Sequence, residues 1–140
     1  MDNRPRVVID TNVWVSALVF GGKPRQVVEL LARGIVEVVI SPEILTEMRR
    51  KIASKFPDFG TDLGLIEILL EQDAELVMLG SITVTASRDD DDNRILETAL
   101  VGNCNYIVSG DKDLLVLGSY EGVEILAPAE FMEMAEKDAQ

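Results

Sequence analysis

The segment Val7-Val8-Ile9-Asp10-Thr11-Asn12 joins a short apolar, β-branched run directly to a carboxylate. Such a run is typical of a β-strand that is buried on both faces, as in a parallel sheet. Residues 106–109 form a second run of this kind, and Gly110-Asp111-Lys112-Asp113 follows it. Ligands bind beyond the carboxyl ends of the strands in open parallel sheets. The two strand exits therefore predict an acidic site at one edge of a parallel sheet.

The rest of the chain alternates between patterns of strands and of helices, which predicts an α/β fold with a central, mostly parallel sheet of four to five strands. We expect helices over residues 11–20, 24–33, 42–55, 62–72, 92–101 and 128–136. We expect strands over residues 6–9, 36–40, 106–109 and 123–126, with the last of these at the edge of the sheet, and a further strand at either 75–79 or 82–85. The chain shows no repeat and no linker, so we expect one domain over residues 1–140.

The composition excludes several classes of protein. Hydrophobic residues make up 47% and charged residues 27% of the 140 residues, as in a globular protein. The chain has no histidine, which excludes nucleophiles that depend on histidine and zinc sites of the cysteine–histidine kind. Its single cysteine, Cys104, excludes an internal disulfide and fits a reducing compartment. We find neither a signal-peptide pattern nor an apolar run near the roughly 20 residues of a membrane span, so we expect a cytoplasmic protein with no membrane contact.

Two further acids are expected to join Asp10 and Asp111 at the edge of the sheet. Projection of the helix over residues 42–55 places Glu47 at the border of its apolar face, although Glu47 could instead pair with Lys51 at the surface. Asp92 lies on the inward side of the first turn of its helix. The preceding acids, Asp89, Asp90 and Asp91, are expected to face solvent or to lie directly behind the metal ligands; alternatively, the whole acidic run only complements the helix N-terminus.

Four carboxylates in one pocket require neutralisation. Two unit charges about 4 Å apart repel by about 4 kcal/mol at an effective dielectric constant near 20. A donor set of oxygen atoms alone suits a hard cation, so we expect Mg²⁺ or Mn²⁺. A cation held in this way activates water and stabilises charge on a phosphodiester. The pocket therefore predicts phosphodiester hydrolysis.

Four segments of the sequence resemble, in order, the motifs of PIN-domain nucleases, and in particular VapC-type proteins, which are commonly the toxins of toxin–antitoxin pairs. These segments are Val7–Val13 with Ser16-Ala17-Leu18, residues 41–48, residues 89–97 and residues 106–115. The resemblance implies a three-layer α/β/α fold and a metal-dependent ribonuclease. It also implies an antitoxin partner and a homodimer.

The resemblance assigns roles to individual residues. It makes Asp10, Glu47, Asp92 and Asp111 the catalytic and metal-binding acids, with Asp113 as a frequent extra ligand; whether Asp111 or Asp113 is the fourth ligand stays open. Asn12 would orient Asp10 or bind the water shell of the metal, and Ser109 supplies a hydroxyl where threonine or serine is usual. Asp90 stands where relatives often have proline. The basic residues that could hold RNA are Lys23, Arg25, Arg49, Arg50, Lys51 and Lys55.

The net charge of −12 opposes binding of nucleic acid over the whole surface, but it does not describe one local face. Two alternatives remain: a PIN fold that only binds RNA or protein, and a receiver-like or phosphatase-like domain with an acidic pocket. Residues 61–72 are apolar over more than one helical face, which predicts a dimer or partner surface there. The alternative is a helix that is wrapped more deeply in its own core.

Overall fold

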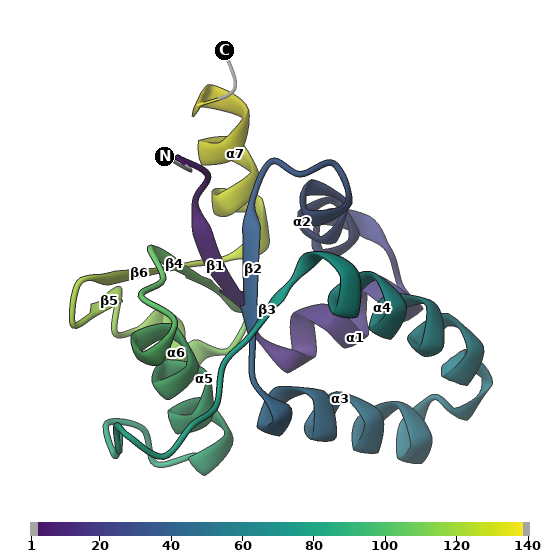
Figure 1. The fold of residues 1–140 in the computed structure, drawn as a ribbon, viewed down its shortest axis with the longest axis horizontal. Helices are drawn as coiled ribbons and strands as arrows, with labels where there is room; N and C mark the ends of the chain where they lie inside the picture. The colour runs from purple at the N-terminus through teal and green to yellow at the C-terminus, as the bar shows by residue number, and fades with distance from the viewer. Residues whose placement is uncertain (1–2, 139–140) are drawn as a thin grey trace.

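The computed structural model describes residues 3–138, which form a six-stranded sheet with helices on both faces (Figure 1). The strand order is β3-β2-β1-β4-β6-β5, and every neighbouring pair is parallel except β5 and β6. The strands are β1 (Arg6–Ile9), β2 (Glu37–Ile40), β3 (Glu75–Leu76), β4 (Tyr106–Val108), β5 (Ser119–Tyr120) and β6 (Val123–Leu126). The predicted α/β class with a central, mostly parallel sheet is confirmed.

The helices form one layer on each side of the sheet, which confirms the three-layer α/β/α arrangement (Figure 1). One layer contains α1 (Thr11–Val19), α2 (Gly22–Ala32), α3 (Pro42–Lys55) and α4 (Gly60–Asp73), with the short 3-10 helix η1 (Pro57–Phe59) between the last two. The other contains α5 (Asp90–Val101) and α6 (Lys112–Leu115). The last helix, α7 (Pro128–Asp138), packs against α2. Among residues 3–138, no helix combines the length and the apolar character that crossing a membrane requires.

The central strands are buried because their residues are apolar on both faces. Val7, Val8 and Ile9 of β1 are at most 1% exposed, and Ile107 and Val108 of β4 are fully buried. The register pairs Ile9 with Val108, so the residues that follow, Asp10 and Ser109, leave the sheet side by side. The strand pairing thus fixes the first two polar side chains of the site.

A close approach of α5 to β2 depends on glycine. A Cβ atom at Gly102, which follows α5, would lie 2.6 Å from a methyl group of Val39. The carbonyl of Gly102 also accepts hydrogen bonds from the guanidinium of Arg6, at 3.0 and 2.7 Å. These contacts fix the C-terminal end of α5 near the start of β1. Its N-terminal end therefore lies near the carboxyl ends of the parallel strands.

Several predictions about the strands and the short helices are wrong. β6 is not an edge strand, because β5 pairs with it antiparallel and covers its outer side; the sheet therefore has one strand more than the largest number expected. The two strands are joined by Glu121 and Gly122, both at positive φ, a tight turn that the sequence analysis overlooked. The third strand forms at β3, within 75–79, and not at 82–85. The helices α6 and η1 were not expected.

Candidate active site

The first acids of the site lie where β1 and β4 end. Asp10 is 5% exposed, and its Oδ2 accepts a hydrogen bond of 2.7 Å from the hydroxyl of Ser109. The same Ser109 oxygen accepts a hydrogen bond of 3.0 Å from the backbone amide of Asp111. Ser109 thereby connects the exits of both strands, as its predicted supporting role requires.

The N-terminal end of α5 brings the next acids to the same edge. One carboxylate oxygen from each of Asp89, Asp92 and Asp111 lies within 4.8 Å of the others. We call these three residues the acid trio. Asp92 is only 4% exposed, whereas Asp89 is exposed. The acid trio includes two of the predicted metal ligands, and Asp10 lies close enough to it for its charge to act on Asp92.

Asp89 was expected to face solvent or to lie behind the metal ligands, but one of its carboxylate oxygens lies within 4.8 Å of those of Asp92 and Asp111. Asp89 is the N-cap of α5, where its side chain accepts a hydrogen bond of 2.9 Å from the backbone amide of Asp91. Asp92 lies three residues later, at the position whose side chain commonly reaches back to the N-cap. This capping spacing, readable in the sequence, could have identified Asp89 as a neighbour of Asp92.

Crowding of like charges changes the protonation of the buried acids. Burial, together with the negative charges of Asp111, Asp89 and Asp10 in that order of size, raises the pKa of Asp92 to about 7. Burial also raises the pKa of Asp10, although the hydrogen bond from Ser109 opposes this. In both groups burial is the largest cause of the shift, and the charge of Asp111 adds to it.

A buried amide fixes the loop that leads into α5. Asn93 is 2% exposed and forms two hydrogen bonds with the backbone of Ser87: its Oδ1 accepts from the amide at 2.8 Å, and its Nδ2 donates to the carbonyl at 2.9 Å. The hydroxyl of Ser87 donates to Asp92 at 3.3 Å and accepts from the amide of Asp89 at 3.1 Å. Ser87 and Asn93 thus orient two members of the acid trio, and the sequence analysis assigned neither of them a role.

A second pair of residues holds the same loop. Glu97 is 5% exposed, and its carboxylate accepts a hydrogen bond of 2.9 Å from the amide of Val84. The guanidinium of Arg94 lies 2.8 Å from Glu97 and compensates this buried charge. The loop before α5 is therefore tied to the helix at two points.

Glu47 lies on the α3 side of the pocket, apart from the acid trio. The helical projection placed it at the border of the apolar face; it is buried, and its carboxylate pairs with Lys51 at 3.1 Å, as the alternative expected, and with Arg50 at 3.6 Å. A side-chain hydrogen bond with Glu47 raises the pKa of Asp91, as does burial. Lys51 also donates a hydrogen bond of 2.6 Å to Oδ1 of Asn12. Glu47 thus contacts Asp91 and two cations, which joins α3 to the start of α5.

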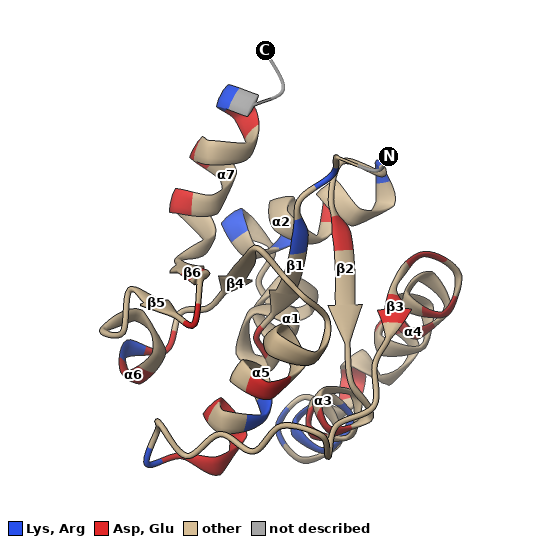
Figure 2. Ribbon diagram, turned by 60° about the vertical axis from the view of Figure 1, so that its left-hand side comes forward, with Lys and Arg blue, Asp and Glu red and all other residues tan. Residues whose placement is uncertain are grey.

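Figure 2 shows this mixture of charges: acidic residues gather at the start of α5, while α3 carries both acidic and basic residues. A groove of about 390 Å³ lies between the two helices, and none of the acid trio lines it. Its polar lining includes Glu47, Arg50, Asp91 and Arg94. Glu47 therefore lies at the wall of this groove.

The remaining predicted site residues lie elsewhere. Asp113 faces Arg88, at 3.3 Å, and the structure does not bring it into the acid trio. Arg49 pairs with Glu67 of α4, at 2.6 Å. Three further lysines and arginines predicted to bind RNA are exposed and lie away from the acids: Lys23, Arg25 and Lys55. The guanidinium of Arg25 donates to the carbonyls of Ala17 and Leu18, at 3.1 and 3.3 Å, at the end of α1.

The donor set of the acid trio fits a hard divalent cation. Each residue offers carboxylate oxygen, which Mg²⁺ and Mn²⁺ prefer over nitrogen or sulfur. The raised pKa of Asp92 shows that these groups repel one another in the absence of a counter-ion. A cation bound here would remove that repulsion.

Comparisons with known proteins agree with this architecture. Residues 6–113 match the family model of the PIN domain, so the chain belongs to the PIN-domain family. An uncharacterized protein of Methanocaldococcus jannaschii, MJ1680, is 31% identical over 144 aligned positions that cover 94% of this chain and 92% of that protein. The fold is similar to a chain in the crystal structure of VapBC2 from Rickettsia felis bound to a DNA fragment from their promoter. That match has a TM-score of 0.59 at 16% identity and covers 86% of this chain and 96% of the other.

PIN domains are generally nucleases. The match to this family overturns the alternative that the chain is a receiver-like or phosphatase-like domain.

Proposed function

We propose that this chain is a metal-dependent endoribonuclease and the toxin of a toxin–antitoxin pair. The observation that carries the nuclease proposal is the acid trio, which adjoins Asp10 at the carboxyl edge of a PIN-type sheet. Membership of the PIN-domain family supports it independently. We propose RNA as the substrate because the sequence resembles VapC-type proteins, and Mg²⁺ or Mn²⁺ as the cofactor because the ligands are carboxylate oxygens.

We assign cation binding to the acid trio and positioning of the water to Asp10. Asp89, Asp92 and Asp111 would hold the cation, which supplies an activated water and offsets charge on the phosphodiester. The hydroxyl of Ser109 orients Asp10 by donating to its Oδ2. The other carboxylate oxygen of Asp10 would hold the attacking water in place at the same edge. Asp92 can hold a proton near neutral pH until the cation binds, because its pKa is about 7.

The substrate strand is proposed to enter along the groove between α3 and α5. Arg50 is two-thirds exposed at this groove and can neutralise a phosphate. Glu47, predicted as a catalytic and metal-binding acid, is proposed to hold Arg50 and Lys51 at the groove. This local positive charge offsets the acidic surface where RNA must approach.

A cleavage assay tests the proposal. Purified protein should cut a mixed-sequence RNA in Mg²⁺ or Mn²⁺ and should stop cutting in excess chelator. Asp10→Asn should abolish cleavage, whereas Asp90→Asn, which removes an exposed charge from the same edge, should not. Binding of RNA with equal affinity in metal and in chelator, without cleavage, would instead support a non-catalytic PIN module.

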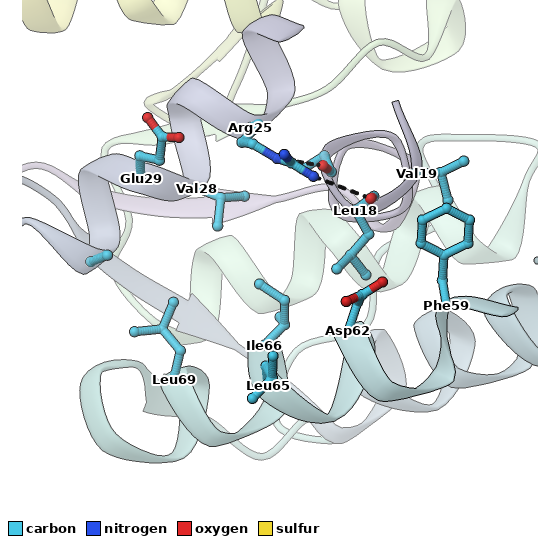
Figure 3. A pocket seen from close by; sticks show the side chains of 12 residues that line it. Leu18, Val19, Arg25, Val28, Glu29, Phe59, Asp62, Leu65, Ile66 and Leu69 are labelled. Carbon is cyan, nitrogen blue, oxygen red and sulfur yellow. Dashed lines mark hydrogen bonds between the residues drawn. The ribbon is translucent and has the colours of Figure 1, made fainter. Parts of the chain in front are cut away.

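The helix α4 provides the surface proposed for dimerisation and for an antitoxin. Only Leu63 and Leu70 of α4 are buried, whereas Leu65 and Ile68 are 63% and 53% exposed, so the described part of the chain does not cover this helix on every side. Figure 3 shows the groove of about 560 Å³ between α1, α2 and α4, lined by apolar side chains that include Leu65. An apolar helix of a partner would fit such a groove.

The partner proposal has its own test. The product of the gene next to this one should copurify with the chain and block cleavage. Loss of copurification with Leu65→Asp, at unchanged cleavage by the variant alone, supports this surface; unchanged copurification argues against it. We also propose that residues 1–140 form one domain and act in the cytoplasm.

A further inference from the structure

The carboxylates of the pocket fall into two groups. The acid trio forms one, and the pair Glu47 and Asp91 forms the other. Lysine and arginine pair with the second group: Lys51 Nζ lies 3.1 Å from Glu47 Oε1, and the guanidinium of Arg50 lies 3.6 Å from Glu47 Oε2. Basic side chains therefore neutralise Glu47 on one side of the pocket, whereas the acid trio on the other side is proposed to be neutralised by a cation.

Lys51 is held inside the pocket and does not extend into solvent. Its side chain is 24% exposed, against 67% for that of Arg50. It has a second oxygen partner, Oδ1 of Asn12, at 2.6 Å, and this contact crosses from α3 to the first turn of α1. An ordinary surface pair one helical turn apart would not need that second, long-range contact.

The ammonium also acts on the acid at the end of β1. Burial raises the pKa of Asp10 most, and the positive charge of Lys51 opposes that shift. Lys51 therefore contacts Glu47 and Asn12 directly and influences Asp10 through space. A metal ion placed between these oxygen atoms would have the same three neighbours.

We propose that the Lys51 ammonium occupies the position of a second metal ion, so that the pocket binds one divalent cation, at the acid trio, and none beside Glu47. Two-metal nucleases use a second divalent ion to neutralise charge at the reacting phosphate. Here a resident side chain takes that place, and a divalent ion beside Glu47 would have to displace it. The inference rests on the proposed function only in that the acid trio holds a metal.

The test is the number of Mn²⁺ ions bound per chain, measured at neutral pH by calorimetry and by the electron paramagnetic resonance signal of free Mn²⁺. We expect one site in the wild-type protein and a second, weaker site in Lys51→Met, where Glu47, Asp91 and Asn12 are left as oxygen ligands. The charge-conserving variant Lys51→Arg should keep one site. Lys55→Met, one turn further along α3 and exposed, is the matched control and should also keep one.

A second change assigns the new site to Glu47. The double variant Lys51→Met, Glu47→Gln should lose the second ion while it retains the first. Two ions in the wild-type protein, or one ion in a folded Lys51→Met variant, overturns the inference. If Lys51→Met does not fold, as judged by circular dichroism, the wild-type count and that of Lys51→Gln decide in the same way.

The outcome separates this inference from the proposed function. One wild-type ion without RNA cleavage supports the role of Lys51 and contradicts the ribonuclease proposal. Two wild-type ions with metal-dependent cleavage contradict the role of Lys51 and support the ribonuclease. Absence of any bound ion in the wild-type protein overturns both.

Discussion

Asp92→Asn is predicted to stabilise the metal-free protein at neutral pH, because the wild-type carboxylate ionises at a cost. The pKa of Asp92 is raised from 3.8 to about 7, chiefly by burial and then by the charges of Asp111 and Asp89. Below pH 3.8 the carboxyl is protonated in both the folded and the unfolded chain, so it contributes no difference. Between pH 3.8 and about 7 the unfolded chain ionises and the folded chain stays largely protonated, so the unfolding free energy of the wild-type protein falls as pH rises through this window.

The size of this loss follows from the shift. Each pKa unit corresponds to about 1.4 kcal/mol, so a shift of roughly three units costs the wild-type protein about 4 kcal/mol at pH 7 and above. Asparagine cannot ionise, and its Oδ1 can still accept the hydrogen bond from Ser87. The variant should therefore match the wild-type protein near pH 4 and exceed it by up to about 4 kcal/mol at pH 8, or roughly 10 °C in melting temperature.

Urea unfolding followed by circular dichroism, in chelator and at constant ionic strength from pH 4 to 8, measures this gap. Asp90→Asn removes an exposed charge from the same helical turn and should show no gain that grows with pH. Excess Mg²⁺ should close the gap, since a bound cation favours the ionised Asp92 of the wild-type protein. A gap that is constant with pH, or a wild-type protein more stable at pH 8, would refute the reasoning.

Four further predictions follow from the same geometry. Asp10→Asn should reduce RNA cleavage at least about 100-fold while leaving the circular dichroism spectrum unchanged, because Ser109 can still donate to the amide oxygen. Millimolar Mg²⁺ should raise the melting temperature of the wild-type protein, and Asp111→Asn should lose most of that increase; an equal increase in both would exclude Asp111 as a ligand. Asn93→Ala should lower the unfolding free energy by about 2 kcal/mol, since two buried hydrogen bonds to one residue are lost, and should also weaken Mg²⁺ binding, as titration calorimetry would show. Leu65→Asp and Ile68→Asp should each convert a dimer to a monomer in light scattering; a wild-type monomer at tens of micromolar would show that this face is not a dimer interface.

Most of the fold was predictable because its signals are local. Uninterrupted β-branched runs identified β1, β2 and β4, and proline after Ser41 marked the start of α3. The strands β3 and β5 have only two residues each, too few for a hydrophobic period to be detected. β3 depends on pairing with β2, which is distant in sequence, whereas β5 pairs with the adjacent β6 across the turn at Glu121 and Gly122.

The acids of the site show the same division. The helical period placed Glu47 at the border of its apolar face and Asp92 on the inward side of its helix, and both side chains are buried in the structure. It did not predict that Glu47 would contact Asp91 instead of Asp92, because that contact depends on the angle and depth at which α3 packs beside α5. The pair Asn93 and Ser87 was missed for a related reason, since a buried amide has no period and its partner is a loop backbone.

The sequence alone determined which residues are carboxylates, that no histidine or thiol set competes with them, and that strand exits and a helix N-terminus carry them. These properties depend on residue identity and on spacings of a few positions. Only the tertiary structure decided that Asp111 meets Asp89 and Asp92, that Asp113 turns to Arg88, and that Lys51 reaches Asn12. Each of those contacts joins side chains from different elements over a few ångströms, and such distances are set by the packing of helices on the sheet.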